Sequence, residues 1–200
     1  MLSTLINPGI DINKKYTDIA KSKLTQKTLE EWLYDNQKPL KYEIFKEDSR
    51  NLVNIWKNNN YGLADFCITS PPYWNQLKQN HIRQEKRKKS GLTTTYSNDT
   101  CDISNIDDYD IFLKAQKDIF MKVYEVLKNK GYLVVITNNL FYKGKLFPLA
   151  FDTAISLSDN WVLKDEQIWC QDDKRLVALG INNAYVGNRH HIYCLIFRKE

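Results

Sequence analysis

The sequence has no long hydrophobic run and no N-terminal signal peptide. A membrane-spanning helix needs about 20 consecutive apolar residues, and no apolar stretch of this chain approaches that length. A secretory signal begins with basic residues that precede an apolar segment, and this pattern is also missing. We therefore expect a protein that neither spans a membrane nor is secreted.

The chain has four cysteines, and no two of them form a Cys-x-x-Cys pair. His190 and His191 lie far in sequence from three of the four, so we expect no zinc site and no other bound metal. Cys67 and Cys194 lie in apolar, strand-like runs, which favours a role as small core residues. This cysteine usage is typical of a reducing compartment, and it predicts a cytoplasmic protein.

Glycine is scarce, with seven residues in the chain, of which Gly9 is the first. No two glycines are separated by a single residue, so the sequence contains no Gly-x-Gly element. Such elements are typical of loops that approach a nucleotide or its phosphates closely. The sequence therefore contains no glycine-rich binding loop of this type.

The net charge is +5, and 42% of the residues are hydrophobic. The apolar content suffices for a core, and the length fits one domain over residues 1–200 with a polar, irregular insertion at about 75–106. A basic balance favours polyanionic partners, although a charge of this size is weak support for them.

Short apolar runs alternate with helical periodicity along the chain, which predicts an α/β layer fold. The predicted strands are 8–12, 42–45, 64–69, 132–137, 161–170 and 191–197. The predicted helices are 15–24, 49–57, 107–130 and one that follows Pro148.

The helix at 107–130 has the clearest pattern. Acidic residues favour its N-terminus, where the helix dipole is positive, and Lys128 and Lys130 favour its C-terminus, where the dipole is negative. Gly131 is expected to end the helix. The run 132–137, YLVVIT, is continuously apolar. Such a run predicts a strand that is buried on both faces.

The most specific motif is Thr-Ser-Pro-Pro-Tyr-Trp at 69–74, directly after an apolar strand. Its two prolines remove two backbone donors and restrict two φ angles. Open α/β sheets bind their ligands at the carboxyl ends of the strands. The motif therefore predicts a rigid corner at the binding edge of the sheet.

The order of motifs resembles that of the DNA amino-methyltransferases, which transfer a methyl group from S-adenosylmethionine to cytosine N4 or adenine N6. TSPPYW is similar to their catalytic motif, and its serine favours cytosine N4. Further similar segments, which extend the resemblance from residue 8 over nearly the whole chain, are GIDINKKYTDIAKSKL (9–24), KEDSRNL (46–52), VLKNKGYLVVITNN (126–139) and NRHHIYCLIFRK (188–199). The resemblance implies a Rossmann-like class I methyltransferase sheet, S-adenosylmethionine as cofactor, and double-stranded DNA with a flipped-out base as partner.

The resemblance implies catalytic roles for Ser70, Pro71, Pro72 and Tyr73. The hydroxyl of Ser70 and the carbonyl of Pro71 would accept the two N–H bonds of the target amine and free its lone pair, while the prolines preorganise that carbonyl. Tyr73 would stack on the extruded base, and Trp74 would wall the base pocket. A simple strand turn is the alternative interpretation of the motif.

The resemblance also implies cofactor contacts. Asp11 would bind the ribose hydroxyls, and Asp48 would accept the adenine amine, with Ser49 and Thr69 beside them. Asp48 is equally well explained as the N-cap of the helix that follows it. A basic run near the motif would either contact DNA phosphates or form a solvated loop, and its candidate contacts are Lys86, Arg87, Lys88 and Lys89.

In this family a glycine-rich loop follows the first, central strand of the sheet, and here both would precede residue 1. We therefore expect an incomplete sheet that lacks a strand between 8–12 and 64–69. Three hypotheses follow: a methyltransferase acting on cytosine N4 or alternatively adenine N6, a truncated inactive remnant with residual nucleic-acid binding, or half of a split enzyme. In the last case a second polypeptide supplies the glycine-rich motif. Methyltransferases of RNA or of protein glutamine are a weaker alternative, which Ser70 disfavours.

Overall fold

The structure is a computed structural model of the chain, and it describes residues 5–25, 40–78, 85, 88–90, 95–97, 99–171 and 189–200. Its strands are β1 (Leu5–Asp11), β2 (Leu40–Lys46), β3 (Ala64–Thr69), β4 (Leu127–Thr137), β5 (Leu140–Tyr142), β6 (Lys145–Phe147), β7 (Trp161–Cys170) and β8 (His191–Lys199). Its α-helices are α1 (Lys14–Thr25), α3 (Leu52–Asn58), α5 (Tyr109–Val126) and α6 (Leu149–Leu157), and its 3₁₀ helices are η1 (Ser49–Asn51), η2 (Trp74–Lys78) and η3 (Ile103–Asn105). Within the described ranges, no helix has the length and apolar character needed to cross a bilayer.

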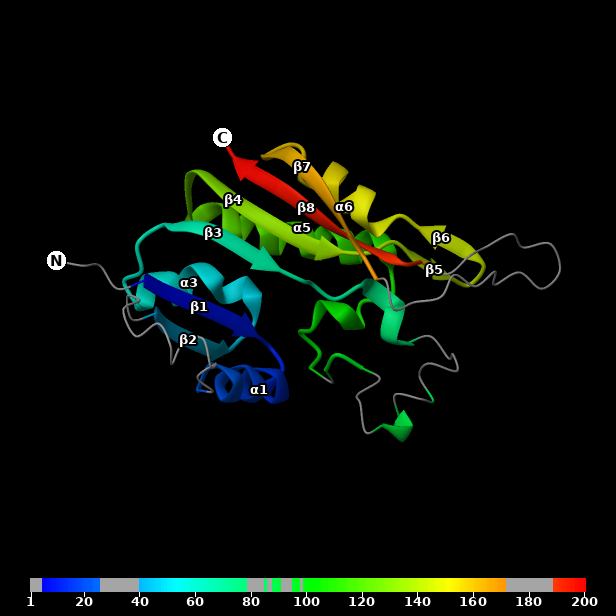
Figure 1. The fold of residues 1–200 in the computed structure, drawn as a ribbon, viewed down its shortest axis with the longest axis horizontal. Coiled ribbons are helices and arrows are strands. Elements are labelled where there is room, and N and C mark those ends of the chain that lie inside the picture. Colours follow the sequence, from blue (N-terminus) through cyan, green and yellow to red (C-terminus); the bar gives the residue numbers. More distant parts are fainter. Residues whose placement is uncertain are drawn as a thin grey trace.

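The predicted α/β fold is confirmed, and the strands form two main sheets (Figure 1). β1 pairs with β2 in parallel. The larger sheet has the order β3-β4-β8-β7, in which β3 and β4 are parallel and β8 runs antiparallel to both of its neighbours. The arrows of β1, β3 and β4 point the same way in Figure 1. Their carboxyl ends therefore lie at one edge of the molecule.

Between the two sheets the fold has an open position. β1 and β3 are each the outermost strand of their own sheet, and within the described residues nothing pairs with either of them on the facing side. This is the position in which the sequence analysis expects a strand to be missing. An unpaired edge carries backbone N–H and C=O groups that lack sheet partners.

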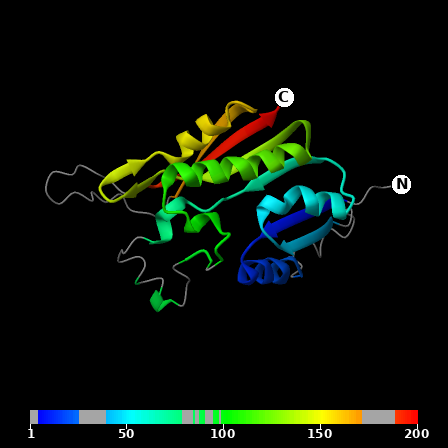
Figure 2. The ribbon, with the colours of Figure 1, turned by 180° about the vertical axis from the view of Figure 1, so that it is seen from behind.

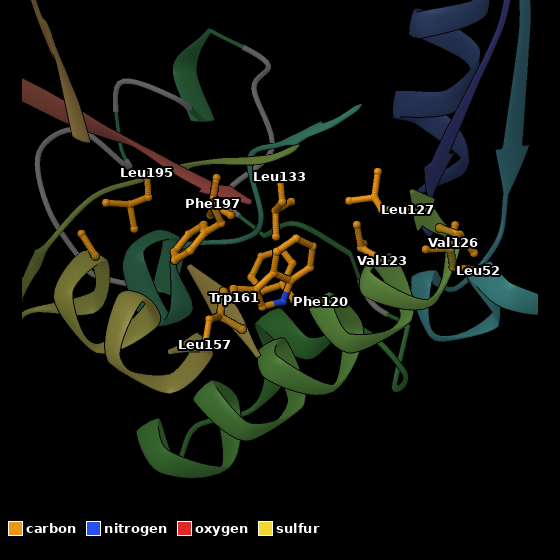
Figure 3. Close-up of a cluster of buried hydrophobic side chains, with 12 residues drawn as sticks. Leu52, Phe120, Val123, Val126, Leu127, Leu133, Leu157, Trp161, Leu195 and Phe197 are labelled. Carbon is orange, nitrogen blue, oxygen red and sulfur yellow. The ribbon is translucent and has the colours of Figure 1, made fainter. Parts of the chain in front are cut away.

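One face of the larger sheet is covered by α5 and α6, and α3 packs against α5 on the same side (Figure 2). Leu133, Val135 and Phe197 are fully buried beneath these helices, and Phe120 of α5 packs onto them (Figure 3). Burial of each such side chain contributes about 1.5–3 kcal/mol. This cluster is the main core of the described chain.

The opposite face of the larger sheet is not covered by any described element. Phe66 and Ile68 of β3 are 53% and 59% exposed, and Tyr132 of β4 is 38% exposed. The prediction that 132–137 is buried on both faces is therefore wrong for the described residues. Leu133 and Val135 face the helices, whereas Tyr132 is exposed and Val134 and Ile136 are half-buried.

The predicted end of the long helix is also wrong. α5 begins after Asp108, whose carboxylate accepts the Ile111 N–H, but it ends at Val126. Leu127 is extended, fully buried and already paired with Ala64 of β3. Sheet pairing and burial of Leu127 thus override the helix signals of the lysines and glycine that follow.

A short hairpin, β5–β6, follows the central strand β4, and no prediction included it. Its turn places Lys143 and Gly144 at positive φ, of 47° and 78°. Its inner side chains Leu140, Tyr142 and Phe147 pack against the region that follows β3. The hairpin therefore stands beside the Ser-Pro-Pro-Tyr-Trp corner.

Gly131 occupies a site of close backbone approach. A Cβ at this position would lie 2.9 Å from the Lys128 carbonyl and 3.1 Å from the Asp65 carbonyl. Because both neighbours are backbone atoms, we expect Gly131→Ala to cost about 1–3 kcal/mol of unfolding free energy, with a loss of about 2–4 °C in Tm per kcal/mol. The control is Gly62→Ala, since a Cβ at Gly62 meets nothing within 4 Å. Equal Tm values for the two variants would contradict this packing.

Candidate active site

The diproline corner lies directly at the carboxyl end of β3, which ends at Thr69. Ser70 is exposed, and its Oγ lies 3.1 Å from the hydroxyl of Tyr73. Pro71, Pro72 and Tyr73 are half-buried, so the corner is neither enclosed in the core nor detached from it. The chain thus presents a hydroxyl and a stiff carbonyl at the edge where α/β sheets bind ligands.

Trp74 anchors this corner. It is 4% exposed and adopts a positive φ of 40°. Its ring lies 5.0 Å from that of Tyr109, 5.2 Å from Tyr142 and 4.6 Å from Phe147. Aromatic clusters of this kind are worth more than their buried area alone. The cluster therefore holds the end of the corner against α5 and the hairpin.

A cavity of 1160 Å³ lies between β1 and β3. It brings together most of the predicted site residues, namely Asp11, Asp48, Ser49, Thr69, Ser70, Pro71 and Pro72. Tyr73 lies outside its lining, and Trp74 instead lines a second cavity of 410 Å³ together with Asp107, Lys143 and Lys145.

Asp11 is a half-buried carboxylate of the large cavity, at the end of β1. Its Oδ1 accepts the backbone N–H of Asn13 at 2.7 Å. Burial raises the pKa of Asp11, the Asn13 hydrogen bond opposes this rise, and the nearby charge of Asp102 adds to it. A carboxylate held in this way can still accept hydrogen bonds from hydroxyl groups of a ligand.

Asp48 is the N-cap of η1, as one of its two interpretations predicted. Its carboxylate accepts the backbone N–H of Arg50 at 2.9 Å and pairs with the Arg50 guanidinium. Burial alone would raise the pKa of Asp48, but the hydrogen bonds and charge of Arg50 outweigh it and lower that pKa. Arg50 also donates to the Cys101 carbonyl at 2.7 Å, which ties this cap to the far wall of the cavity.

That far wall was missed by the sequence analysis. It comes from the expected insertion, where Tyr96, Asp102 and Ile103 line the cavity. Asp102 is buried, accepts Ser104 N–H at 2.8 Å and Ser97 Oγ–H at 2.7 Å, and so caps η3. The spacing of Asp102 and Ser104 is a capping signal that identifies the turn, but nothing local indicates that it faces β1.

The basic residues are only partly described. Lys86 and Arg87 lie outside the described residues, as does the segment 172–188. Lys88 and Lys89 are exposed. Lys143 and Lys145, which the sequence analysis did not select, are exposed on the hairpin beside the corner.

No protein-family model and no curated protein matches the chain. Solved structures do match. A candidate DNA modification methylase from Thermus thermophilus, complexed with S-adenosyl-L-methionine, is 19% identical, covers 76% of this chain and 53% of its own, and has a TM-score of 0.47. A SAM-dependent methyltransferase from Methanosarcina mazei is 13% identical, covers 97% of this chain and 82% of its own, and has a TM-score of 0.49.

A candidate rRNA methylase from Clostridium thermocellum is 14% identical, covers 96% of this chain and 74% of its own, and has a TM-score of 0.49. The chain spans about half the length of the Thermus methylase that it matches. Each of these three structures is less than 25% identical to the chain and has a TM-score below 0.5.

The raised pKa of Asp11 predicts a pH-dependent effect on stability. Because the folded pKa lies above the unfolded value, ionised Asp11 weakens the fold, and the effect grows as pH rises from the unfolded to the folded pKa. We expect Asp11→Asn to raise Tm at about pH 7 by roughly 1–3 °C, a small shift because the group is half exposed, and to have less effect near pH 4.

The matched control is Asp18→Asn, on the exposed face of α1, where Asp18 pairs with Lys14 at 2.7 Å. This change relieves no burial and should not raise Tm. Thermal melts over this pH range measure both variants. A Tm for Asp11→Asn that does not exceed the wild type at neutral pH would contradict the assignment of burial as the dominant cause.

Proposed function

We propose that this chain is the catalytic part of an S-adenosylmethionine-dependent methyltransferase that modifies the exocyclic amine of a DNA base. One observation supports this most: the Ser70–Pro72 corner and the strand-end carboxylate Asp11 line the same cavity, although they lie far apart in the sequence. The motif resemblance assigns the first to the target amine and the second to the cofactor ribose.

The chemistry fits the residues present. An exocyclic amine is a poor nucleophile because its lone pair is delocalised into the base. Acceptors that engage its N–H bonds favour a pyramidal nitrogen whose lone pair is available. The Ser70 hydroxyl and the Pro71 carbonyl are such acceptors, and the two prolines hold the carbonyl in place before the base arrives.

S-adenosylmethionine, when bound, supplies a methyl group on a positively charged sulfur. Asp11 would hold its ribose, since this carboxylate lines the cavity and a single hydrogen bond from the Asn13 N–H leaves it further acceptor capacity. The Asp48 carboxylate is paired with Arg50. It would therefore accept the adenine amine through oxygen lone pairs that Arg50 does not use. Ser49 and Thr69 complete this part of the lining.

Tyr73 and Trp74 divide the roles that the motif gives them. The half-buried Tyr73 keeps its hydroxyl near Ser70 and has a ring with which an extruded base could stack. Trp74 would wall the base pocket from the smaller cavity that it lines, and its burial in the aromatic cluster holds the corner in place. A rigid corner matters because positioning errors of about 1 Å cost up to 10²-fold in rate.

We predict that Ser70→Ala lowers methyl transfer by about 10²–10³-fold, the typical cost of removing one preorganised hydrogen-bonding group. The substitution is made in the chromosomal copy of the native organism, where any natural partner is present. Mass spectrometry of the nucleosides then measures N4-methylcytosine and N6-methyladenine. The methylated base that falls identifies the target, and the serine form of the motif favours cytosine N4.

Ser158→Ala is the matched control, because Ser158 is an exposed hydroxyl at the end of α6 that bonds to the Ile155 carbonyl. It should leave both nucleosides unchanged. Unchanged amounts of both methylated nucleosides in the Ser70→Ala strain would remove the proposed role and, with it, the proposed function.

DNA binding should involve the basic residues beside the corner. Lys143 and Lys145 stand on the exposed hairpin, and Lys88 and Lys89 are exposed in the insertion. Phosphate contacts by lysines position a protein on DNA without reading its sequence. The net charge of +5 is consistent with such a partner.

We predict that Lys143→Gln with Lys145→Gln reduces the slope of log Kd against log salt by about 0.9 for each phosphate that is no longer neutralised. Fluorescence anisotropy with a labelled duplex measures the slope. The control pair, Lys57→Gln with Lys130→Gln, lies where β3 and β4 begin, at the far end of the sheet from the corner. Slopes that fall equally in both pairs would show that only overall charge matters.

A further inference from the structure

Tyr96 is the residue at which the two sides of the large cavity are joined. It comes from the insertion, lines the cavity and is half-buried. Its carbonyl accepts the side-chain amide N–H of Asn13, 83 residues earlier in the sequence. Its hydroxyl lies 3.4 Å from the backbone nitrogen of Tyr73, 23 residues earlier. One residue therefore contacts both the segment that follows β1 and the diproline corner.

Each of these two contacts continues to a residue of the proposed site. The backbone N–H of Asn13 donates to Asp11 Oδ1 at 2.7 Å, and the hydroxyl of Tyr73 lies 3.1 Å from Ser70 Oγ. In the order Asp11, Asn13, Tyr96, Tyr73 and Ser70, each residue is thus hydrogen-bonded to the next. This chain of contacts joins the carboxylate proposed for the cofactor ribose to the hydroxyl proposed for the target amine.

Residues close to Tyr96 in the sequence fix the insertion independently of the corner. The hydroxyl of Ser97 donates to the buried Asp102 carboxylate at 2.7 Å. Arg50 of η1 donates to the Cys101 carbonyl at 2.7 Å. Because the insertion is fixed at both points, a shift of the corner away from Tyr96 would break their contact instead of carrying Tyr96 with it.

The two prolines limit how the corner can be held. Pro71 and Pro72 have no N–H, so Tyr73 carries the first backbone donor after Ser70. The chain then turns at once, since Trp74 has a positive φ of 40°. The hydrogen bond from the Tyr73 N–H to the Tyr96 hydroxyl therefore fixes the corner where the prolines leave no other donor.

The Tyr73 hydroxyl extends this effect to Ser70. The Ser70 oxygen can accept an N–H of the target amine only when its own proton points elsewhere. The Tyr73 hydroxyl is an acceptor within reach of that proton. The position of Tyr73 thus determines in which direction the Ser70 lone pairs point.

We propose that Tyr96 is a positioning residue for methyl transfer. It holds the Tyr73 backbone, and through Tyr73 the Ser70 lone pairs, in a fixed position relative to Asp11. The inference rests on the proposed function, in which Asp11 and Ser70 act on the two partners of one reaction. Tyr96 contacts neither the methyl group nor the amine in this role and acts through Tyr73.

Hydrogen exchange in the full chain tests the contact without any activity. Tyr96→Phe removes the hydroxyl, keeps the ring and leaves the carbonyl that Asn13 contacts. We expect the Tyr73 amide to exchange about fivefold faster, from the loss of one hydrogen bond of ordinary strength. The control Tyr124→Phe removes a hydroxyl that donates to the Glu200 carbonyl, also at 3.4 Å, and should leave the Tyr73 amide unchanged. NMR-detected exchange at this single amide measures both variants.

A second variant tests whether the contacts act together. Asn13→Asp keeps a side-chain oxygen to accept the Lys15 N–H but replaces the donor to Tyr96 with an oxygen. It should speed exchange at Tyr73 by about twofold. The double variant with Tyr96→Phe should exchange no faster than Tyr96→Phe alone. Rates that multiply in the double variant would show independent contacts and would overturn the proposed coupling.

Kinetics test the positioning role, with the enzyme purified from the native organism together with any natural partner. We expect Tyr96→Phe to lower kcat by about tenfold, within the range for a misplacement of up to about 1 Å, and to leave KM for S-adenosylmethionine unchanged. Tyr124→Phe should change neither constant. A raised KM with an unchanged kcat would identify a direct cofactor contact and overturn the inference.

The positioning role and the proposed function fail in different ways. If Ser70→Ala loses methyl transfer while Tyr96→Phe keeps the wild-type kcat, the positioning role is wrong and the proposed function stands. A wild-type exchange rate of the Tyr73 amide in Tyr96→Phe has the same meaning. If Ser70→Ala leaves methylation intact, the proposed function is wrong, and faster exchange in Tyr96→Phe then reports a structural contact alone.

Discussion

Backbone hydrogen bonding along strand edges is the constraint that divides this molecule. The four-stranded sheet satisfies it on every internal edge and buries one face under α5 and α6. The β1–β2 pair has only two strands, and isolated two-stranded sheets are marginally stable in water. It is attached through the buried Leu52 of α3 and the partly buried Ile10, both of which pack on the main core. The four-stranded sheet and the β1–β2 pair therefore differ in how firmly packing holds them in place.

The candidate site is shared unequally between these parts. The Ser70–Tyr73 corner extends from the well-packed sheet and is fastened at Trp74 by an aromatic cluster. Asp11 and Asp48 belong to the smaller part, where Arg50 links the Asp48 cap to the Cys101 carbonyl. The groups that we propose to engage the target base are thus attached to the well-packed sheet, whereas the groups proposed to hold the cofactor depend on how well β1 is held. Whatever fills the space beside β1 would also fix the position of Asp11.

The sequence was sufficient to locate the diproline corner and every described strand except β5 and β6, because the signals of these elements are local. Apolar runs bounded by polar residues mark strands, and adjacent prolines mark a break wherever they occur. It failed at Leu127, where lysines and a glycine suggested a longer helix but pairing with Ala64 decided the outcome. It also missed Tyr96 and Asp102, since their approach to β1 is a contact between distant segments that no periodicity records. The exposure of one face of 132–137 was not predicted for the same reason. Whether another element packs on a face of a strand depends on residues elsewhere in the sequence.

The exposure of Phe66 and Ile68 affects how fast the protein would be degraded in a cell. Apolar side chains beside an open strand edge are features that chaperones and proteases recognise, and an edge of this kind also templates aggregation. Copies without a cover would be removed faster than covered ones.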